Sequence, residues 1–196
     1  MSFLMGFLVA TLSIGSSALG TPCETSPNES TTPLASPVDP IETIEPVVTP
    51  LEERPNEEIE YLDIPLSHEL QDYIRDLCNS YDVPFELVIA LIDVESSFCP
   101  NIVSRTNDYG YMQINIHNHE WLSEELGITD FLDPKQNILA GIYILSSQLE
   151  ATNGDPVTAL MRYNCGATGA KRLWAQGIYS TSYTDKVMAA YEVYKN

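Results

Sequence analysis

Phe85-Glu86-Leu87-Val88-Ile89-Ala90-Leu91-Ile92-Asp93-Val94 is an almost wholly apolar run, and Glu95 follows it directly. Pro84 suits the first position of a helix, with Asp82 or Val83 just outside it, and Pro100 cannot continue one. The run therefore predicts a buried helix that carries a single glutamate at its own C-terminal end.

Two physical effects act on the carboxyl group of Glu95. Apolar surroundings disfavour its charged form, and so does the negative end of the helix dipole, so both raise its pKa. A glutamate that keeps its proton near neutral pH can act as a general acid. The helix alone is also compatible with an ordinary surface glutamate, which is the simpler interpretation until the downstream motifs are considered.

The charge of the chain excludes some functions. Its 196 residues hold 28 acids and 9 bases, a formal net charge of -19. Nucleic-acid binding needs clustered Lys and Arg, and no basic stripe is present, so we expect no nucleic-acid partner. Attraction to an anionic membrane or cell wall through charge is excluded for the same reason.

The first 62 residues differ in composition from the rest. Residues 3–19 are uncharged and mostly apolar, and Ala18-Leu19-Gly20 suits a signal-peptidase site, although no Lys or Arg precedes Arg54. We expect residues 1–20 to be a cleaved signal peptide or an uncleaved membrane anchor, with neither as the third alternative. Residues 21–62, rich in Pro, Thr and Glu, predict a disordered linker. The protein is then exported, and either secreted or held at the cell surface or cell wall.

Residues 63–196 predict one mainly α domain with a small irregular or β insert. Ser67 can cap a first helix, Met112-Gln113-Ile114-Asn115-Ile116 alternates like a short strand, and Asn118 can cap a brief helix ended by Gly127. Further helices are expected from three other starts: Asp133-Pro134, where Gln136 completes a capping box; Asp155-Pro156, with a break near Gly166; and Ser182.

Four ordered blocks follow the buried helix and carry the chemistry. Glu95-Ser96 is followed by Gly110-Tyr111-Met112-Gln113, then by Asn137-Ile138-Leu139-Ala140-Gly141, then by Tyr163-Asn164-Cys165-Gly166, and finally by Tyr183. The order resembles the soluble-lytic-transglycosylase (SLT) domain family, which has a lysozyme-like fold related to goose-type lysozyme. The resemblance covers roughly residues 64–195. Tyr111 and Arg162 replace the usual Leu and Ala, which puts details of sugar binding in doubt but not the chemistry.

The resemblance implies a role for each matching residue. Glu95 would protonate the oxygen between N-acetylmuramic acid (MurNAc) and N-acetylglucosamine (GlcNAc), then accept the proton of the muramoyl 6-hydroxyl as a 1,6-anhydro ring closes. Met112, Gln113, Tyr163, Asn164 and Tyr183 would bind the glycan. For Tyr163 we expect a hydroxyl that orients the Glu95 carboxyl, while Met112 and Tyr183 are also compatible with core packing.

A glycosidase that uses water normally needs a second carboxylate. Asp93 lies about 200° around the helix from Glu95 and faces away. Asp108 is the remaining candidate, and we expect it to structure its loop, with a catalytic role as the alternative.

The sequence therefore predicts a monomeric peptidoglycan lytic transglycosylase without cofactor or metal. Its partner is the peptidoglycan glycan strand, and any membrane contact is made only through the N-terminal segment. A hydrolytic muramidase and a non-catalytic wall-binding module remain as alternatives. A disulfide between Cys99 and Cys165 is compatible with their places beside the motifs, and buried thiols are an equally good interpretation.

Overall fold

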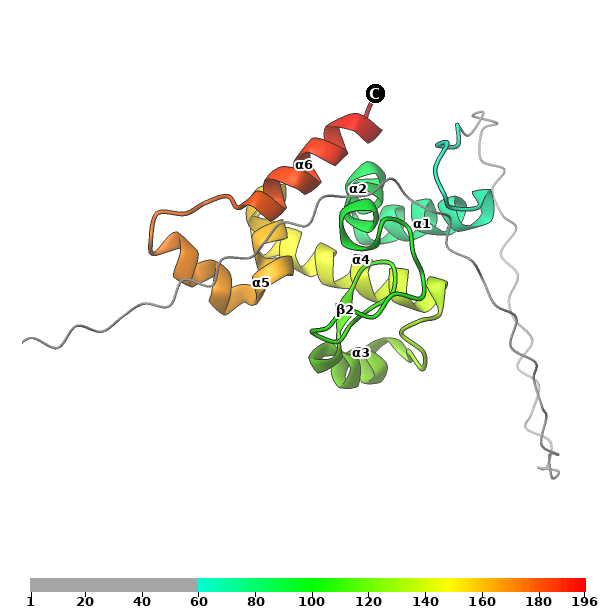
Figure 1. Cartoon of the computed structure of the whole chain (residues 1–196), viewed down its shortest axis with the longest axis horizontal. Coiled ribbons are helices and arrows are strands. Elements are labelled where there is room, and N and C mark those ends of the chain that lie inside the picture. The colour runs from blue at the N-terminus through cyan, green and yellow to red at the C-terminus, as the bar shows by residue number, and fades with distance from the viewer. Residues whose placement is uncertain (1–59) are drawn as a thin grey trace, which may run out of the picture. The chain divides into compact units, whose positions relative to one another are not determined.

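Helix α2 (Phe85–Ser96) is the buried helix that the apolar run predicts, in a computed structural model that describes residues 60–196 (Figure 1). All six side chains from Leu87 to Ile92 are 0% exposed. A helix that is apolar on every side must be covered on every side. The predicted signal peptide or anchor and nearly all of the predicted linker lie outside the described residues.

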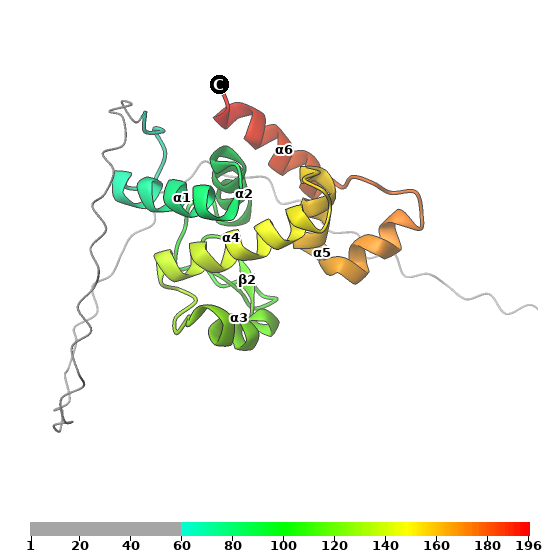
Figure 2. The ribbon, with the colours of Figure 1, turned by 180° about the vertical axis from the view of Figure 1, so that it is seen from behind.

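Neighbouring helices supply that cover. Helix α1 (His68–Tyr81) packs on α2 and on α4 (Pro134–Glu150), and α6 (Ser182–Tyr194) packs along α2. Helix α5 (Pro156–Trp174) contacts α4 and α6, and it bends at Gly166, near the break that the sequence predicts. Both views show α1 and α2 on one side of α4, with α3 (His119–Leu126) on the other (Figures 1 and 2).

The insert between α2 and α3 is small and largely irregular, as predicted. Strands β1 (Asp108–Tyr109) and β2 (Ile114–Asn115) pair antiparallel, and a 3₁₀ turn η1 (Ile116–Asn118) leads into α3. The expected strand over 112–116 is therefore wrong at Met112 and Gln113, which lie in a turn. Gln113 has a φ of 48°, and its amide donates to the Gly110 carbonyl at 2.9 Å, so the backbone curls instead of extending.

Local capping explains most helix ends. The side chains of Ser67 and Asp133 accept hydrogen bonds from Leu70 and Gln136 N–H, as predicted. The expected capping box is only half formed, because the Gln136 amide oxygen accepts from Thr129 N–H at 2.7 Å instead. Pro84 lies just before α2 with an extended backbone, one position earlier than predicted.

One hydrophobic core joins the helices to the insert. Its fully buried side chains come from α1, α2, the insert, α3, α4 and α5: Ile74, Leu87, Ile89, Leu91, Ile92, Met112, Ile114, Leu122, Ile138, Ile142, Leu145 and Leu160. Within residues 60–196, no helix combines the length and the apolar character that crossing a bilayer requires.

Asn137 fastens the insert to α4. Its side chain is 0% exposed; its oxygen accepts from Met112 N–H at 2.9 Å, and its nitrogen donates to the carbonyls of Tyr109 at 2.7 Å and Phe131 at 2.8 Å. Gly110 has a φ of 71°, and a Cβ there would collide with the Asn137 amide. The insert therefore packs on the Asn137 side chain too closely for any residue with a Cβ at position 110.

We expect Asn137→Ala to lower the free energy of unfolding by about 2–4 kcal/mol, because it leaves a buried N–H and two carbonyls without their partner. Denaturant unfolding measures this loss. The matched change at exposed Asn101 should cost less than about 0.5 kcal/mol. Equal stabilities of the two variants would show that the Asn137 side chain does not hold the insert on α4.

Candidate active site

A cavity of about 520 Å³ opens between the insert and helices α2, α4 and α5. Four of the predicted site residues line it together, namely Glu95, Gln113, Tyr163 and Asn164. Asp108 faces the same space. The fold thus brings together residues that are far apart in the sequence.

Tyr183 holds the Glu95 carboxyl. Its hydroxyl donates to Glu95 Oε1 at 2.6 Å, across the contact between α6 and α2. The expected contact from Tyr163 is wrong, because the Tyr163 hydroxyl donates to the Met112 carbonyl at 2.8 Å. Tyr183 therefore orients the acid, which was expected of Tyr163, and the Tyr163 hydroxyl holds the insert in place.

The environment of Glu95 raises its pKa to about 7. Burial is the largest cause, the negative charge of Asp108 raises it further, and the hydrogen bond from Tyr183 partly opposes both. At pKa 7 the carboxyl is about half protonated at neutral pH, so it can both give and take a proton.

Met112 is a core residue. Its side chain is 0% exposed, and a Cβ at Gly141 would collide with its sulfur. The structure therefore favours core packing over contact with a ligand. Gln113, the next residue, is half-buried in the cavity wall, with its amide on the carbonyl of Gly110.

The bend in α5 shapes the opposite wall. Gly166 has φ 70° and ψ 164°, so the helix breaks just after Tyr163-Asn164-Cys165 and presents that turn to the cavity. Asn164 and Cys165 are both exposed there. No disulfide joins Cys165 to Cys99 or Cys78, the other cysteines among residues 60–196.

Asp108 does organise its loop, as expected. It accepts from the hydroxyls of Ser104 and Thr106, and from Asn115 Nδ2 at 2.6 Å. Desolvation raises the pKa of Asp108, but the three hydrogen bonds together bring it below the ordinary value. Asp108 is therefore ionised at neutral pH, where Glu95 is about half protonated.

Four non-glycine residues between Glu95 and Ile114 have a left-handed backbone. Ser97 and Phe98 follow Glu95 with φ of 49° and 60°, and Asn107 and Gln113 have φ of 61° and 48°. Such left-handed conformations cost non-glycine residues roughly 1 kcal/mol each. Gln113 is the one of these four that lines the cavity, and Asp82 and Asn153 have the same conformation elsewhere in the fold, so the surrounding contacts offset this cost at several places.

Asn115 is the cavity residue that the sequence interpretation missed. It is the cross-strand partner of Asp108, so the two side chains project from the same face of the hairpin. No strand alternation with Gln113 could have found it, because Gln113 lies in the turn and only Ile114 and Asn115 form the strand. His117 and Asn118 also line this end of the cavity.

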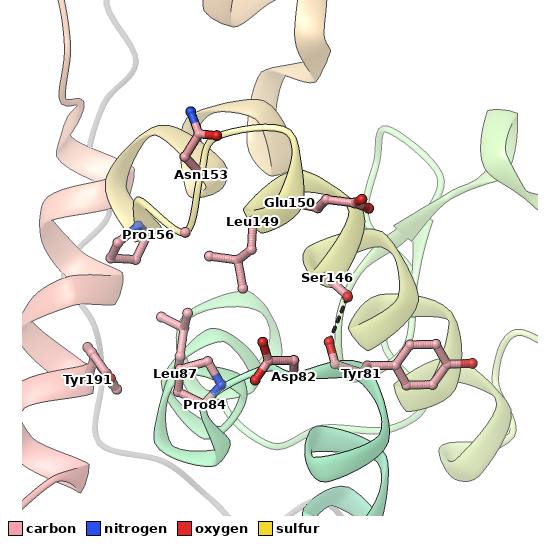
Figure 3. Close-up of a pocket in the computed structure, with 11 residues that line it drawn as sticks. Tyr81, Asp82, Pro84, Leu87, Ser146, Leu149, Glu150, Asn153, Pro156 and Tyr191 are labelled. Atoms are coloured by element: carbon pink, nitrogen blue, oxygen red, sulfur yellow. Dashed lines mark hydrogen bonds between the residues drawn. The ribbon is translucent and has the colours of Figure 1, made fainter.

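A second cavity, of about 650 Å³, lies where the α1–α2 connection faces the α4–α5 loop and Tyr191 of α6 (Figure 3). Ser146 there donates to the carbonyl of Tyr81 at 2.7 Å. Its two acids, Asp82 and Glu150, are exposed to solvent. Water solvates both, so this cavity lacks the buried acid that makes the Glu95 cavity a candidate active site.

Histidines give no sign of a metal centre. Among residues 60–196, no three His, Cys, Asp or Glu side chains come together as metal ligands. His119 is half-buried and stacks on Phe131 with ring centroids 3.6 Å apart.

A mainly helical domain whose insert and helices enclose a polar cleft with a half-buried glutamate has the lysozyme-like architecture. Among proteins with that architecture, the chain belongs to the transglycosylase SLT domain family, whose model matches residues 72–185. This confirms the family that the four sequence blocks predict.

Two known proteins are similar in sequence to part of this chain. A transglycosylase of Enterobacteria phage PRD1 is 34% identical over 108 residues, covering 55% of this chain and 37% of the relative. Membrane-bound lytic murein transglycosylase C of Photorhabdus laumondii subsp. laumondii is 27% identical over 143 residues, covering 66% of this chain and 40% of the relative. The chain thus spans about two fifths of these relatives.

Solved structures share the fold. The 70 kDa soluble lytic transglycosylase of Escherichia coli superposes with a TM-score of 0.58 at 19% identity, covering 67% of this chain and 24% of that one. An inactive mutant of lytic transglycosylase Slt from Pseudomonas aeruginosa gives 0.56 at 19% identity, with the same coverages. The predicted mainly α, lysozyme-like fold is therefore confirmed.

Glu95 should make stability depend on pH. Its folded-state pKa of about 7 lies above the ordinary glutamate value of 4.5, so the folded chain binds this proton more tightly than the unfolded chain. That contribution is complete below the unfolded pKa and is lost as pH rises through the folded pKa. Relative to the wild type, Glu95→Gln should therefore gain about 1–3 kcal/mol between about pH 4.5 and pH 8.5. Denaturant unfolding across this range measures the gain, and a difference independent of pH would contradict the raised pKa.

The hydroxyl of Tyr183 should lower the pKa of Glu95. Because its hydrogen bond favours the carboxylate, Tyr183→Phe should move that pKa above about 7. Carboxyl ¹³C NMR titration measures the shift. Tyr163→Phe is the matched control, since its hydroxyl bonds to Met112, and an equal shift in both variants would refute the assignment.

Proposed function

We propose that this protein is a peptidoglycan lytic transglycosylase that cleaves the β-1,4 bond between MurNAc and GlcNAc. Membership of the SLT family supports this assignment, as do the names of the two relatives. The observation that carries it is the carboxyl of Glu95, half-buried in the cavity, held by Tyr183 and poised at a pKa of about 7.

Glu95 acts twice in the proposed reaction. Its proton passes to the glycosidic oxygen as the bond to the MurNAc anomeric carbon breaks, and GlcNAc leaves with a free hydroxyl. The muramoyl 6-hydroxyl then bonds to that carbon and returns its proton to the Glu95 carboxylate. Because the nucleophile belongs to the substrate, no water is consumed and the product is a 1,6-anhydro end.

The cavity walls would hold the glycan. Gln113 and Asn164 offer both donors and acceptors to acetamido and hydroxyl groups, and the Tyr163 ring can pack on a sugar face. Tyr183 positions Glu95 and need not touch sugar. We also propose a monomer that acts outside the cytoplasm, where its substrate lies, and that needs no cofactor.

A hydrolytic muramidase is the second candidate, because Asp108 places another carboxylate in the same cavity. Hydrolysis adds one water to the product, so mass spectrometry of digested peptidoglycan separates the two reactions. Anhydro muropeptides support the lytic reaction, and reducing ends alone would replace it with hydrolysis.

Glu95→Gln should lower turnover of purified peptidoglycan by about 10²–10⁴-fold, the usual contribution of acid–base catalysis, while binding to insoluble peptidoglycan persists. Release of soluble muropeptides measures turnover. Asp93→Asn is the matched control on the same helix, because Asp93 accepts from the Tyr194 hydroxyl at 2.9 Å, away from the cavity. Unchanged turnover in Glu95→Gln would refute Glu95 as the acid, whereas a wild-type protein that binds peptidoglycan without any turnover would be a wall-binding module.

A further inference from the structure

We propose that Asp108 is a second functional carboxylate of this cleft, one that stays ionised and stabilises the positive charge that develops on the sugar as the glycosidic bond breaks. The proposal rests on the proposed function, since it concerns the same reaction. It departs from a cleft in which Glu95 works alone, because Asp108 forms no bond with substrate and gives no proton.

The β1–β2 hairpin positions the Asp108 carboxylate in the cavity. Asp108 in β1 pairs with Asn115 in β2, so both side chains project from one face of the hairpin, and both line the cavity that contains Glu95. Asn137 holds the following turn against α4 through the N–H of Met112. The carboxylate is therefore carried on a fastened element and is directed toward the space where the sugar would lie.

The partners of Asp108 leave its charge intact. All three donors, Ser104, Thr106 and Asn115, are uncharged groups. The described residues that line the cavity include no Lys or Arg. Hydrogen bonds from neutral groups favour the carboxylate without neutralising it, so its field still acts across the cavity.

The cleavage chemistry needs such a charge. Glycosidic bonds break through a transition state that resembles an oxocarbenium ion, with positive charge on the ring oxygen and anomeric carbon. A preorganised charge of opposite sign lowers that barrier because it needs no reorientation during the reaction. Two carboxyls whose environments push their pKa values apart are the arrangement expected for one acid and one charge stabiliser.

Asp108 also acts on Glu95. Its negative charge is one cause of the raised pKa of Glu95. The other titratable groups around Glu95 are Tyr183 from α6, Tyr163 and Cys165 from α5, and His117 from η1. Asp108 is the one carboxyl among these neighbours, so removing its charge should lower the pKa of Glu95.

The test compares Asp108→Asn with Asp108→Glu. With a soluble GlcNAc–MurNAc tetrasaccharide, Asp108→Asn should lower kcat by about 10²-fold with KM changed less than about threefold. The alkaline limb of its pH profile should shift to lower pH by about half a unit or more, because Glu95 loses its proton at a lower pH. Asp108→Glu keeps the charge and should leave that limb near its wild-type position.

Ser104→Ala separates charge from loop structure. It removes hydroxyl contacts to the Asp108 side chain and to the N–H groups of Thr106 and Asp108, so it loosens the same loop while the carboxylate remains. We expect a lower melting temperature but an alkaline limb near that of the wild type. If Ser104→Ala and Asp108→Asn lose the same activity with the same profile, Asp108 is only a structural residue and the proposal fails.

The wild-type protein gives an independent measurement if Asp108→Asn does not fold. Carboxyl ¹³C NMR titration should show Asp108 fully ionised at about pH 5 and Glu95 still protonated. An Asp108 that takes up its proton above that pH would overturn the proposal.

Failure of the proposed role of Asp108 can be distinguished from failure of the proposed function. An inactive Glu95→Gln beside a fully active Asp108→Asn would reject the second carboxylate and keep the proposed function. Full activity in Glu95→Gln would reject the proposed function itself.

Discussion

The buried amide of Asn137 is the contact on which the cleft depends. It joins α4 to the backbone of the insert at Tyr109 and Met112, and to the α3–α4 connection at Phe131, so the turn that carries Gln113 has one position relative to the helices. The Tyr163 hydroxyl adds a tie from α5 to the same turn. Gly110 is small because this approach leaves no room for a side chain. Without these ties, the insert would be a short hairpin of two residue pairs, too little to hold a cavity wall by itself.

Two carboxyls then face one cavity in opposite chemical states. Glu95 is carried by an apolar helix and meets one hydroxyl donor, so burial dominates and its pKa rises to about 7. Asp108 lies on a polar hairpin with three neutral donors, so hydrogen bonding dominates and its charge is retained. The net charge of -19 explains neither state, because exposed charges are screened within about 10 Å at ordinary ionic strength.

Local sequence signals predicted the helices well, because capping and apolar periodicity involve residues close together in the chain. Ser67, Asp133 and Asp155 cap where expected, and Gly166 breaks α5. The predictions failed where a distant partner competed with a local one. Gln136 turns to Thr129 and Asp130 instead of closing its capping box, and Gln113 curls back to Gly110 instead of extending as a strand.

By itself, the sequence determined that a buried helix ends in Glu95 and that Gln113, Tyr163 and Asn164 belong to the same set of motifs. Only the tertiary structure decided which hydroxyl reaches the acid, because Tyr183 lies 88 positions from Glu95 and meets it only when α6 packs on α2. It also decided that Met112 points into the core and that Asp108 shares the cavity with Glu95. The physical reason is that the direction of a side chain depends on how its element packs, whereas the element itself is encoded by neighbouring residues.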